Sequence, residues 1–66
     1  MAVVKIIEVL AQSEKSWEDA AQTAVTVAAK SVRNIKSIYI ENMQATVEDN
    51  RIIGYRVDAK ISFLVE

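Results

Sequence analysis

The side chains able to do chemistry in this chain are carboxylates, hydroxyls and cations. The 66 residues contain no histidine and no cysteine, which excludes zinc fingers, disulfide bonds, thiolate nucleophiles and imidazole acid–base catalysis. Carboxylates are the hard oxygen ligands that calcium prefers, and five of them are candidates: Glu41, Glu48, Asp49, Asp58 and Glu66. Their spacing matches no calcium-binding loop, so the main interpretation is solvated surface, with a cation site as the alternative.

Patterns that would indicate catalysis are missing from the sequence. A single glycine leaves no glycine-rich loop to bind phosphate. The sequence gives no reason to expect a buried pair of carboxylates, which acid–base catalysis would need. We therefore expect a binding or structural protein and not an enzyme.

Length and composition predict one domain, residues 1–66, that needs a partner chain. A chain of this size buries only about 60% of the surface that its unfolded form exposes. Small domains therefore usually depend on disulfides, a metal or a partner. Hydrophobic residues nevertheless make up 52% of the sequence, which indicates self-association.

Charge and hydropathy exclude two other classes of partner. Eight basic residues against nine acidic ones give a net charge of −1, which argues against a nucleic-acid partner. The first residues lack the features of a signal peptide, and the longest uncharged run, residues 20–29, is too short to span a membrane. We expect a soluble, cytoplasmic protein with no membrane partner.

The first half of the chain predicts one strand and one helix. Residues 3–10 are dense in β-branched side chains and indicate a strand, followed by a polar connection over 11–15. Ser16 can cap a helix, with Asp19 in the capping-box position. Alanines then recur at three-to-four spacing and predict a face that packs closely, until Asn34 ends the helix.

The second half predicts a long hairpin. Strands are expected over residues 36–47 and 51–66, joined by the turn-forming cluster 48–50. One side of the last strand is apolar: Ile53, Tyr55, Val57, Ala59, Ile61, Phe63 and Val65. Strict alternation on the strand before it places Ser37, Tyr39, Glu41 and Met43 on one side, and Ile38, Ile40, Asn42 and Gln44 on the other.

The expected fold class is α+β, with β-α-β-β order and a three-stranded antiparallel sheet of order 1-3-2 wrapped around one helix. The last strand would reach roughly 50 Å at about 3.3 Å per residue. A compact chain of 66 residues has a radius of gyration of only about 11 Å. The strand must therefore bend or extend beyond its own subunit.

Four stretches, in this order and spacing, resemble the dodecins, a family of small flavoproteins. They are VKIIEV at 4–9, SWEDAA at 16–21, RNI at 33–35 and YRVDAKISF at 55–63. The resemblance covers the whole chain and implies the fold above and a hollow homododecamer. It also implies binding and storage of riboflavin, FMN or FAD, without enzymatic activity. In dodecins the flavin lies at a twofold contact, stacked on a tryptophan and hydrogen-bonded by a glutamine.

The sequence departs from the family at both of these positions. The tryptophan position falls at Ser37 and the glutamine position at Arg56, with Tyr39 as a substitute stacking residue and Lys36 as a further flavin-binding candidate. Loss of stacking costs about 1–3 kcal/mol. An arginine that only donates leaves the ring N–H unpaired, at about 1–3 kcal/mol more. Flavin binding is therefore expected to be weak.

Some dodecins without the tryptophan are described as calcium binders, and the sequence resembles that branch more closely. The alternative function is thus a flavin-free shell that binds calcium or an anion, or serves a structural role, with the metal ligands left unassigned. Trp17 is interpreted as a packing anchor, with a ligand platform as the alternative. Simple packing likewise competes with flavin stacking at Tyr39.

Overall fold

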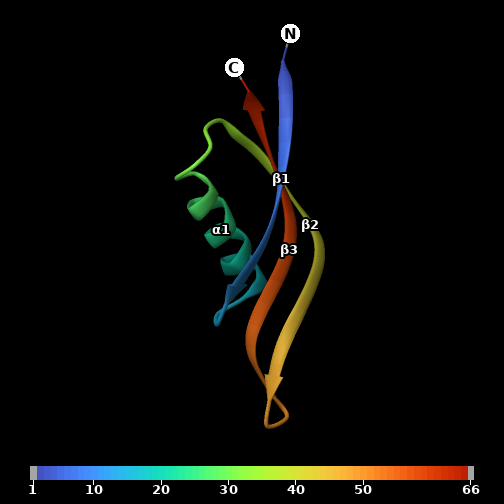
Figure 1. Ribbon diagram of the computed structural model, residues 1–66. Coiled ribbons are helices and arrows are strands. Elements are labelled where there is room, and N and C mark those ends of the chain that lie inside the picture. The colour runs from blue at the N-terminus through green and yellow to red at the C-terminus, as the bar shows by residue number, and fades with distance from the viewer. Residues whose placement is uncertain (1, 66) are drawn as a thin grey trace.

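A computed structural model describes residues 2–65 and confirms the predicted topology. The elements are β1 (Val3–Ser13), α1 (Trp17–Ala28), β2 (Ile35–Glu48) and β3 (Arg51–Val65) (Figure 1). They form one sheet of order β1-β3-β2 in which both neighbouring pairs are antiparallel. The longest strand, β3, is therefore the central one.

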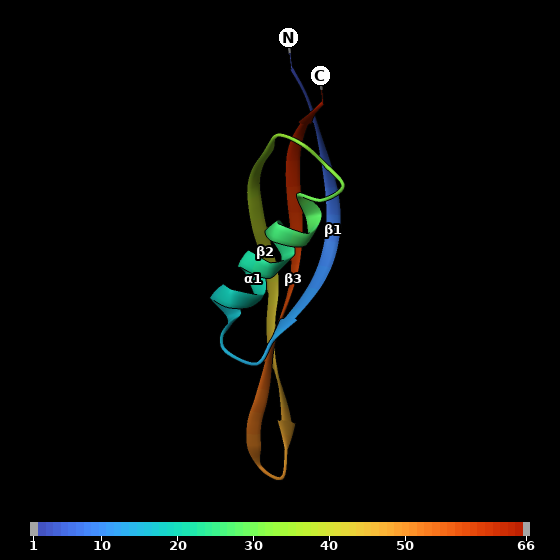
Figure 2. The same ribbon diagram turned by 90° about the vertical axis from the view of Figure 1, so that its left-hand side faces the viewer.

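The core lies between the inner face of the sheet and the alanine face of α1. The helix lies over that side of the sheet, and the hairpin projects beyond it (Figure 2). Val57, Ala59 and Ile61 on β3 are at most 1% exposed, and Ala20 and Ala24 on the helix are also buried. Alternation on β3 places its apolar side chains toward the helix. The small alanines let the helix approach closely, as their spacing predicts.

The Ser16 cap of α1 follows the prediction, but the Asp19 carboxylate bonds to Ser13 instead of to the Ser16 N–H, and the helix ends earlier than predicted. The backbone N–H of Asp19 donates to the Ser16 hydroxyl at 2.9 Å, while the Asp19 carboxylate accepts from the Ser13 hydroxyl at 2.6 Å. The helix ends at Ala28 instead of continuing to Asn34. The next turn tightens, because the N–H groups of Lys30 and Ser31 bond to carbonyls three residues back. Asn34 itself has a φ of 60°, the left-handed conformation expected of it.

Strand β1 is longer than its apolar stretch predicts. It continues through the expected polar connection to Ser13, because Ala11, Gln12 and Ser13 pair with Val57, Arg56 and Tyr55 of β3. Backbone pairing to a long central strand decides the end of β1. The polarity of the side chains does not.

The β2–β3 hairpin projects beyond the helix as an arm (Figure 1). Its turn residues Asp49 and Asn50 have φ of 52° and 63°, which suits a tight two-residue hairpin turn. The molecule measures 52 Å along its longest axis, with a radius of gyration of 13.5 Å against about 11 Å for a compact chain of this length. Apolar side chains on this hairpin are exposed: Met43, Val47, Ile52 and Ile53.

The strict alternation predicted for β2 is wrong beyond Ile40, because the strand contains two bulges. The register shifts between Ile35 and Ser37, which leaves Lys36 as the inserted residue, and again between Ile40 and Asn42. After the second bulge Met43 pairs with Val57 on the inner face, and Gln44 pairs with Arg56 on the other face. The inserted residue Glu41 causes this change of side, because an extra residue reverses the alternation beyond it.

Candidate functional site

The candidate site lies on the outer face of the sheet, which is the face opposite α1. Alternation along β3 places Arg56, Asp58, Lys60 and Ser62 on this face. In the register, Glu8 of β1 lies opposite Lys60, and Leu10 lies opposite Asp58. Residues that are far apart in the sequence therefore form rows across the three strands.

Three carboxylates, one from each strand, come together in the middle of this face. Glu8 of β1, Glu41 of β2 and Asp58 of β3 each offer an oxygen within 4.8 Å of the others. The β2 bulge contributes directly, because Asn42 pairs with Asp58 and Glu41 is the inserted residue beside it. We call Glu8, Glu41 and Asp58 the carboxylate cluster.

The carboxylate cluster is electrostatically strained by its own negative charge. The pKa of Glu8 is raised above 4.5, first by a hydrogen bond to the Glu41 side chain and then by the charges of Asp58 and Glu41. Lys60 opposes this rise in the pKa of Glu8. Its Nζ lies 3.6 Å from Glu41 Oε1, in an ion pair at which the Lys60 and Glu41 side chains are 44% and 29% exposed.

The donor set of the cluster fits a hard divalent cation. Calcium takes six to eight oxygen ligands at about 2.3–2.6 Å, so two of its ligand oxygens lie at most about 5 Å apart. Oxygens within 4.8 Å of one another meet that limit. Three carboxylates supply up to six oxygens, and the exposed Asn42 offers an amide oxygen opposite Asp58. A calcium ion held here would relieve the mutual repulsion of the carboxylates.

The residues predicted for flavin binding are spread along the sheet within one chain. Ser37 shares a hydrogen bond between hydroxyl groups with Ser62. Arg56 donates from Nη2 to the Gln12 side-chain oxygen at 2.9 Å. Ser62 and Arg56 are six residues apart on β3, about 20 Å at 3.3 Å per residue. Ser37 and Arg56 could therefore contact the same flavin only if they came from different subunits.

The other two flavin candidates lie near Ser37. Tyr39 pairs with Lys60 and is 66% exposed, so its ring is available for stacking. Lys36 is the exposed residue inserted at the first bulge of β2.

The structure sorts the five carboxylates named from the sequence. It brings Glu41 and Asp58 together, places Glu48 and Asp49 at the tip of the hairpin, and leaves Glu66 outside the described residues. Sequence reasoning missed Glu8, the third member of the cluster. The only available signal was the antiparallel register of β1 on β3, which places Glu8 beside Lys60 and diagonal to Asp58.

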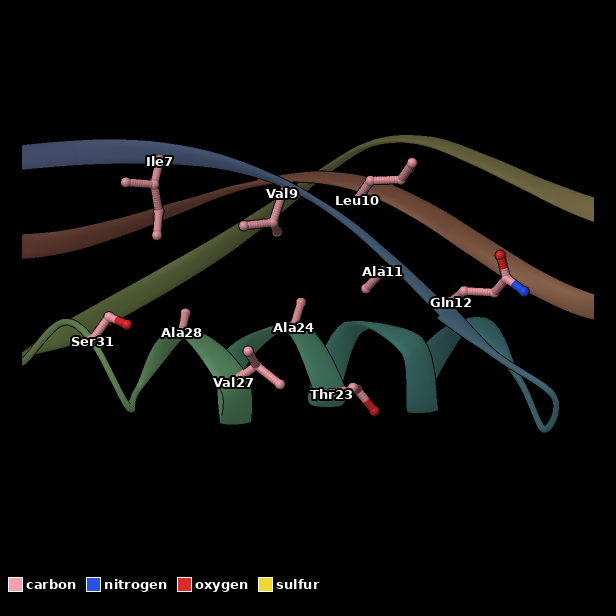
Figure 3. Close-up of a pocket in the computed structure, with 10 residues that line it drawn as sticks. All are labelled: Ile7, Val9, Leu10, Ala11, Gln12, Thr23, Ala24, Val27, Ala28 and Ser31. Atoms are coloured by element: carbon pink, nitrogen blue, oxygen red, sulfur yellow. The ribbon is translucent and has the colours of Figure 1, made fainter.

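A groove of about 440 Å³ lies between β1 and α1. Figure 3 shows Ile7, Val9 and Ala11 of β1 facing Ala24 and Ala28 of the helix. The groove is lined mainly by apolar side chains, with Gln12, Thr23 and Ser31 as its polar members, so it favours packing over polar ligand recognition. Trp17, the other ligand candidate, instead contacts Tyr55 edge-on and donates from Nε1 to the Gln44 carbonyl, as expected of a packing anchor.

Comparisons with known proteins give one consistent result. The Dodecin family model matches residues 3–66. Calcium dodecin of Mycobacterium tuberculosis is 35% identical over 63 residues, which cover 96% of this chain and 89% of that protein. The crystal structure of calcium dodecin from the same organism, described as a calcium-chelating antigen with a novel calcium-binding site, has a TM-score of 0.83. It is 33% identical, with 97% of this chain and 91% of the other covered.

A second solved relative supports the same fold. A mutant of the Thermus thermophilus dodecin superposes with a TM-score of 0.94 at 26% identity, covering 100% of this chain and 98% of that one.

Among residues 2–65, no helix has the length and hydropathy required to cross a membrane.

Proposed function

The chain belongs to the dodecin family, and from that premise we propose that it is a calcium-binding dodecin. Glu8, Glu41 and Asp58 would hold the ion. The observation that carries this proposal is the convergence of three carboxylates from three strands within 4.8 Å. Support from outside the chain comes from calcium dodecin, which is 35% identical and bears calcium in its name.

The electrostatics of the carboxylate cluster favour the same proposal. The hydrogen bond to Glu41 and the nearby charges of Asp58 and Glu41 raise the pKa of Glu8. A divalent cation removes that repulsion and takes oxygen ligands of this kind. The bound calcium would serve structure or storage, and we propose no catalytic step.

We propose that flavin is at most a weak ligand of this dodecin. Ser37 provides no aromatic surface, and Arg56 is already hydrogen-bonded to Gln12. Breaking that contact would add to the cost of turning Arg56 toward a ring. Tyr39 remains the candidate for residual stacking.

We further propose that the protein assembles as a cytoplasmic homododecamer of about 89 kDa, from twelve chains of 7.4 kDa. Two features support association of identical chains: the exposed apolar side chains on the projecting hairpin and the apolar groove beside α1. Light scattering across a wide concentration range measures the mass. A monomer or a simple dimer throughout would contradict the assembly.

Calcium titration by calorimetry tests the proposed site. The metal-free protein should bind calcium in a fixed ratio to its chains, and Asp58→Asn should weaken binding by at least about 10- to 100-fold, the range seen when even an outer-shell partner of a metal is lost. Asp49→Asn is the matched control, because it makes the same change at the hairpin tip and should leave the affinity unchanged. Equal affinity in Asp58→Asn and the wild type would overturn the assignment of the site.

A further inference from the structure

We propose that Lys60 is a tethered competitor for the carboxylate cluster and that it determines how tightly the cluster binds calcium. The inference rests on the proposed function and goes beyond it, because it assigns control of affinity to a residue that is not a ligand. The ammonium group would pair with Glu41 in the metal-free protein and be displaced when calcium binds.

The position of Lys60 is fixed by the central strand. Its Nζ lies 3.6 Å from Glu41 Oε1, and its backbone partners are Glu8 on one side and Tyr39 on the other. Asp58 is two residues away on the same face of β3. All three carboxylates are therefore neighbours of one flexible lysine.

Other cations do not replace Lys60 at this place. Between residues 2 and 65, Lys60–Glu41 is the one ion pair within 4 Å. Arg56 lies on the same face beyond Asp58, but its guanidinium donates from both Nε and Nη2 to the Gln12 side-chain oxygen. Lys60 is therefore the cation paired with the cluster, in agreement with its lowering of the pKa of Glu8.

Two physical consequences follow from this arrangement. Lys60 pairs with one of the two Glu41 oxygens, and its positive charge repels a second cation nearby. An exposed lysine–carboxylate pair is weak, so calcium can displace it, and the four-carbon stem lets the ammonium group move into solvent. A doubly charged ion a few ångströms from a unit charge gains about tenfold in affinity when that charge is removed.

Calcium titration of three variants tests the inference. Lys60→Met keeps an unbranched side chain without charge and should bind calcium about tenfold more tightly than the wild type. Lys60→Arg retains the charge and should stay near the wild type. Lys30→Met is the matched control, because Lys30 lies in the turn after α1, on the helix side of the sheet. The gain in Lys60→Met should shrink as potassium chloride rises, since salt screens exposed charges.

A second readout, without calcium, shows whether Lys60 pairs with Glu41 in solution. At fixed neutral pH, the carboxyl ¹³C NMR signal of Glu41 should move in Lys60→Met and not in Lys30→Met. An unmoved signal, or a Lys60→Met affinity equal to or below that of the wild type, would overturn the role of Lys60 while the site itself stands. Absence of calcium binding in the wild type and in every variant would instead refute the proposed function, and the competition with it.

Discussion

Replacing Trp17 with phenylalanine should lower the free energy of unfolding by about 1 kcal/mol. The indole Nε1 donates to the Gln44 carbonyl at 2.9 Å, which ties the start of α1 to β2 just beyond the second bulge. Its ring also meets Tyr55 edge-on, with centroids 4.9 Å apart and planes at 76°. Phenylalanine loses the hydrogen bond, worth about 0.5–1.5 kcal/mol, and keeps the edge contact.

Leucine at the same position should cost about 2 kcal/mol, because the aromatic pair contributes about 0.5–1.5 kcal/mol more. Thermal unfolding at a fixed chain concentration measures both variants. A loss of 1 kcal/mol corresponds to a fall in Tm of about 4–8 °C for a domain of this size. Tyr39→Phe is the control, since this ring is exposed and should change stability by no more than about 0.5 kcal/mol. A Trp17→Phe protein as stable as the wild type would show that the hydrogen bond to Gln44 contributes nothing to stability.

Three further predictions concern the hairpin, the carboxylate cluster and the flavin positions. In Gly54→Ala the new Cβ would lie 2.7 Å from the Thr46 hydroxyl, so the free energy of unfolding should fall by about 1–3 kcal/mol. Adding Thr46→Ala should restore most of that stability, and a loss that persists in the double variant would contradict the clash. In metal-free protein, Glu8→Gln should match the wild type below pH 4.5 and become the more stable of the two as pH rises. Because the pKa of Glu8 is raised in the folded state, the favourable contribution of protonated Glu8 to stability is lost as pH rises through that pKa. Urea unfolding at several pH values measures the difference in stability, and an advantage of Glu8→Gln confined to acid would contradict the prediction. Ser37→Trp combined with Arg56→Gln should improve riboflavin affinity by about 100-fold, from stacking and a satisfied ring edge; unquenched flavin fluorescence in a double variant with wild-type mass would contradict this.

The fold was largely predictable because local and global patterns agree in this chain. Alternation along β3 and the alanine spacing of α1 each indicate one buried face, and both faces meet in the core. The ends of elements were less predictable. Ser13 stays in β1 because β3 offers it a partner, and α1 ends at Ala28 through a tightening turn, neither of which leaves a mark in composition.

The candidate site was only partly predictable, since it depends on register. Glu41 and Asp58 are recognisable as oxygen ligands from residue type alone. Their meeting depends on the bulge between Ile40 and Asn42, where strict alternation gives no warning. Glu8 joins them only because β1 pairs with β3 in one particular register, and a shift of one residue would turn it to the other face.

A crystal structure of the protein grown with calcium, recorded with anomalous data, tests the central claim most directly. We expect an anomalous peak on the outer face, about 2.3–2.6 Å from oxygens of Glu8, Glu41 and Asp58. In the same crystal Lys60 Nζ should have moved away from Glu41. A calcium ion bound elsewhere, such as at Glu48 and Asp49 on the hairpin tip, with Lys60 still paired to Glu41, would contradict it.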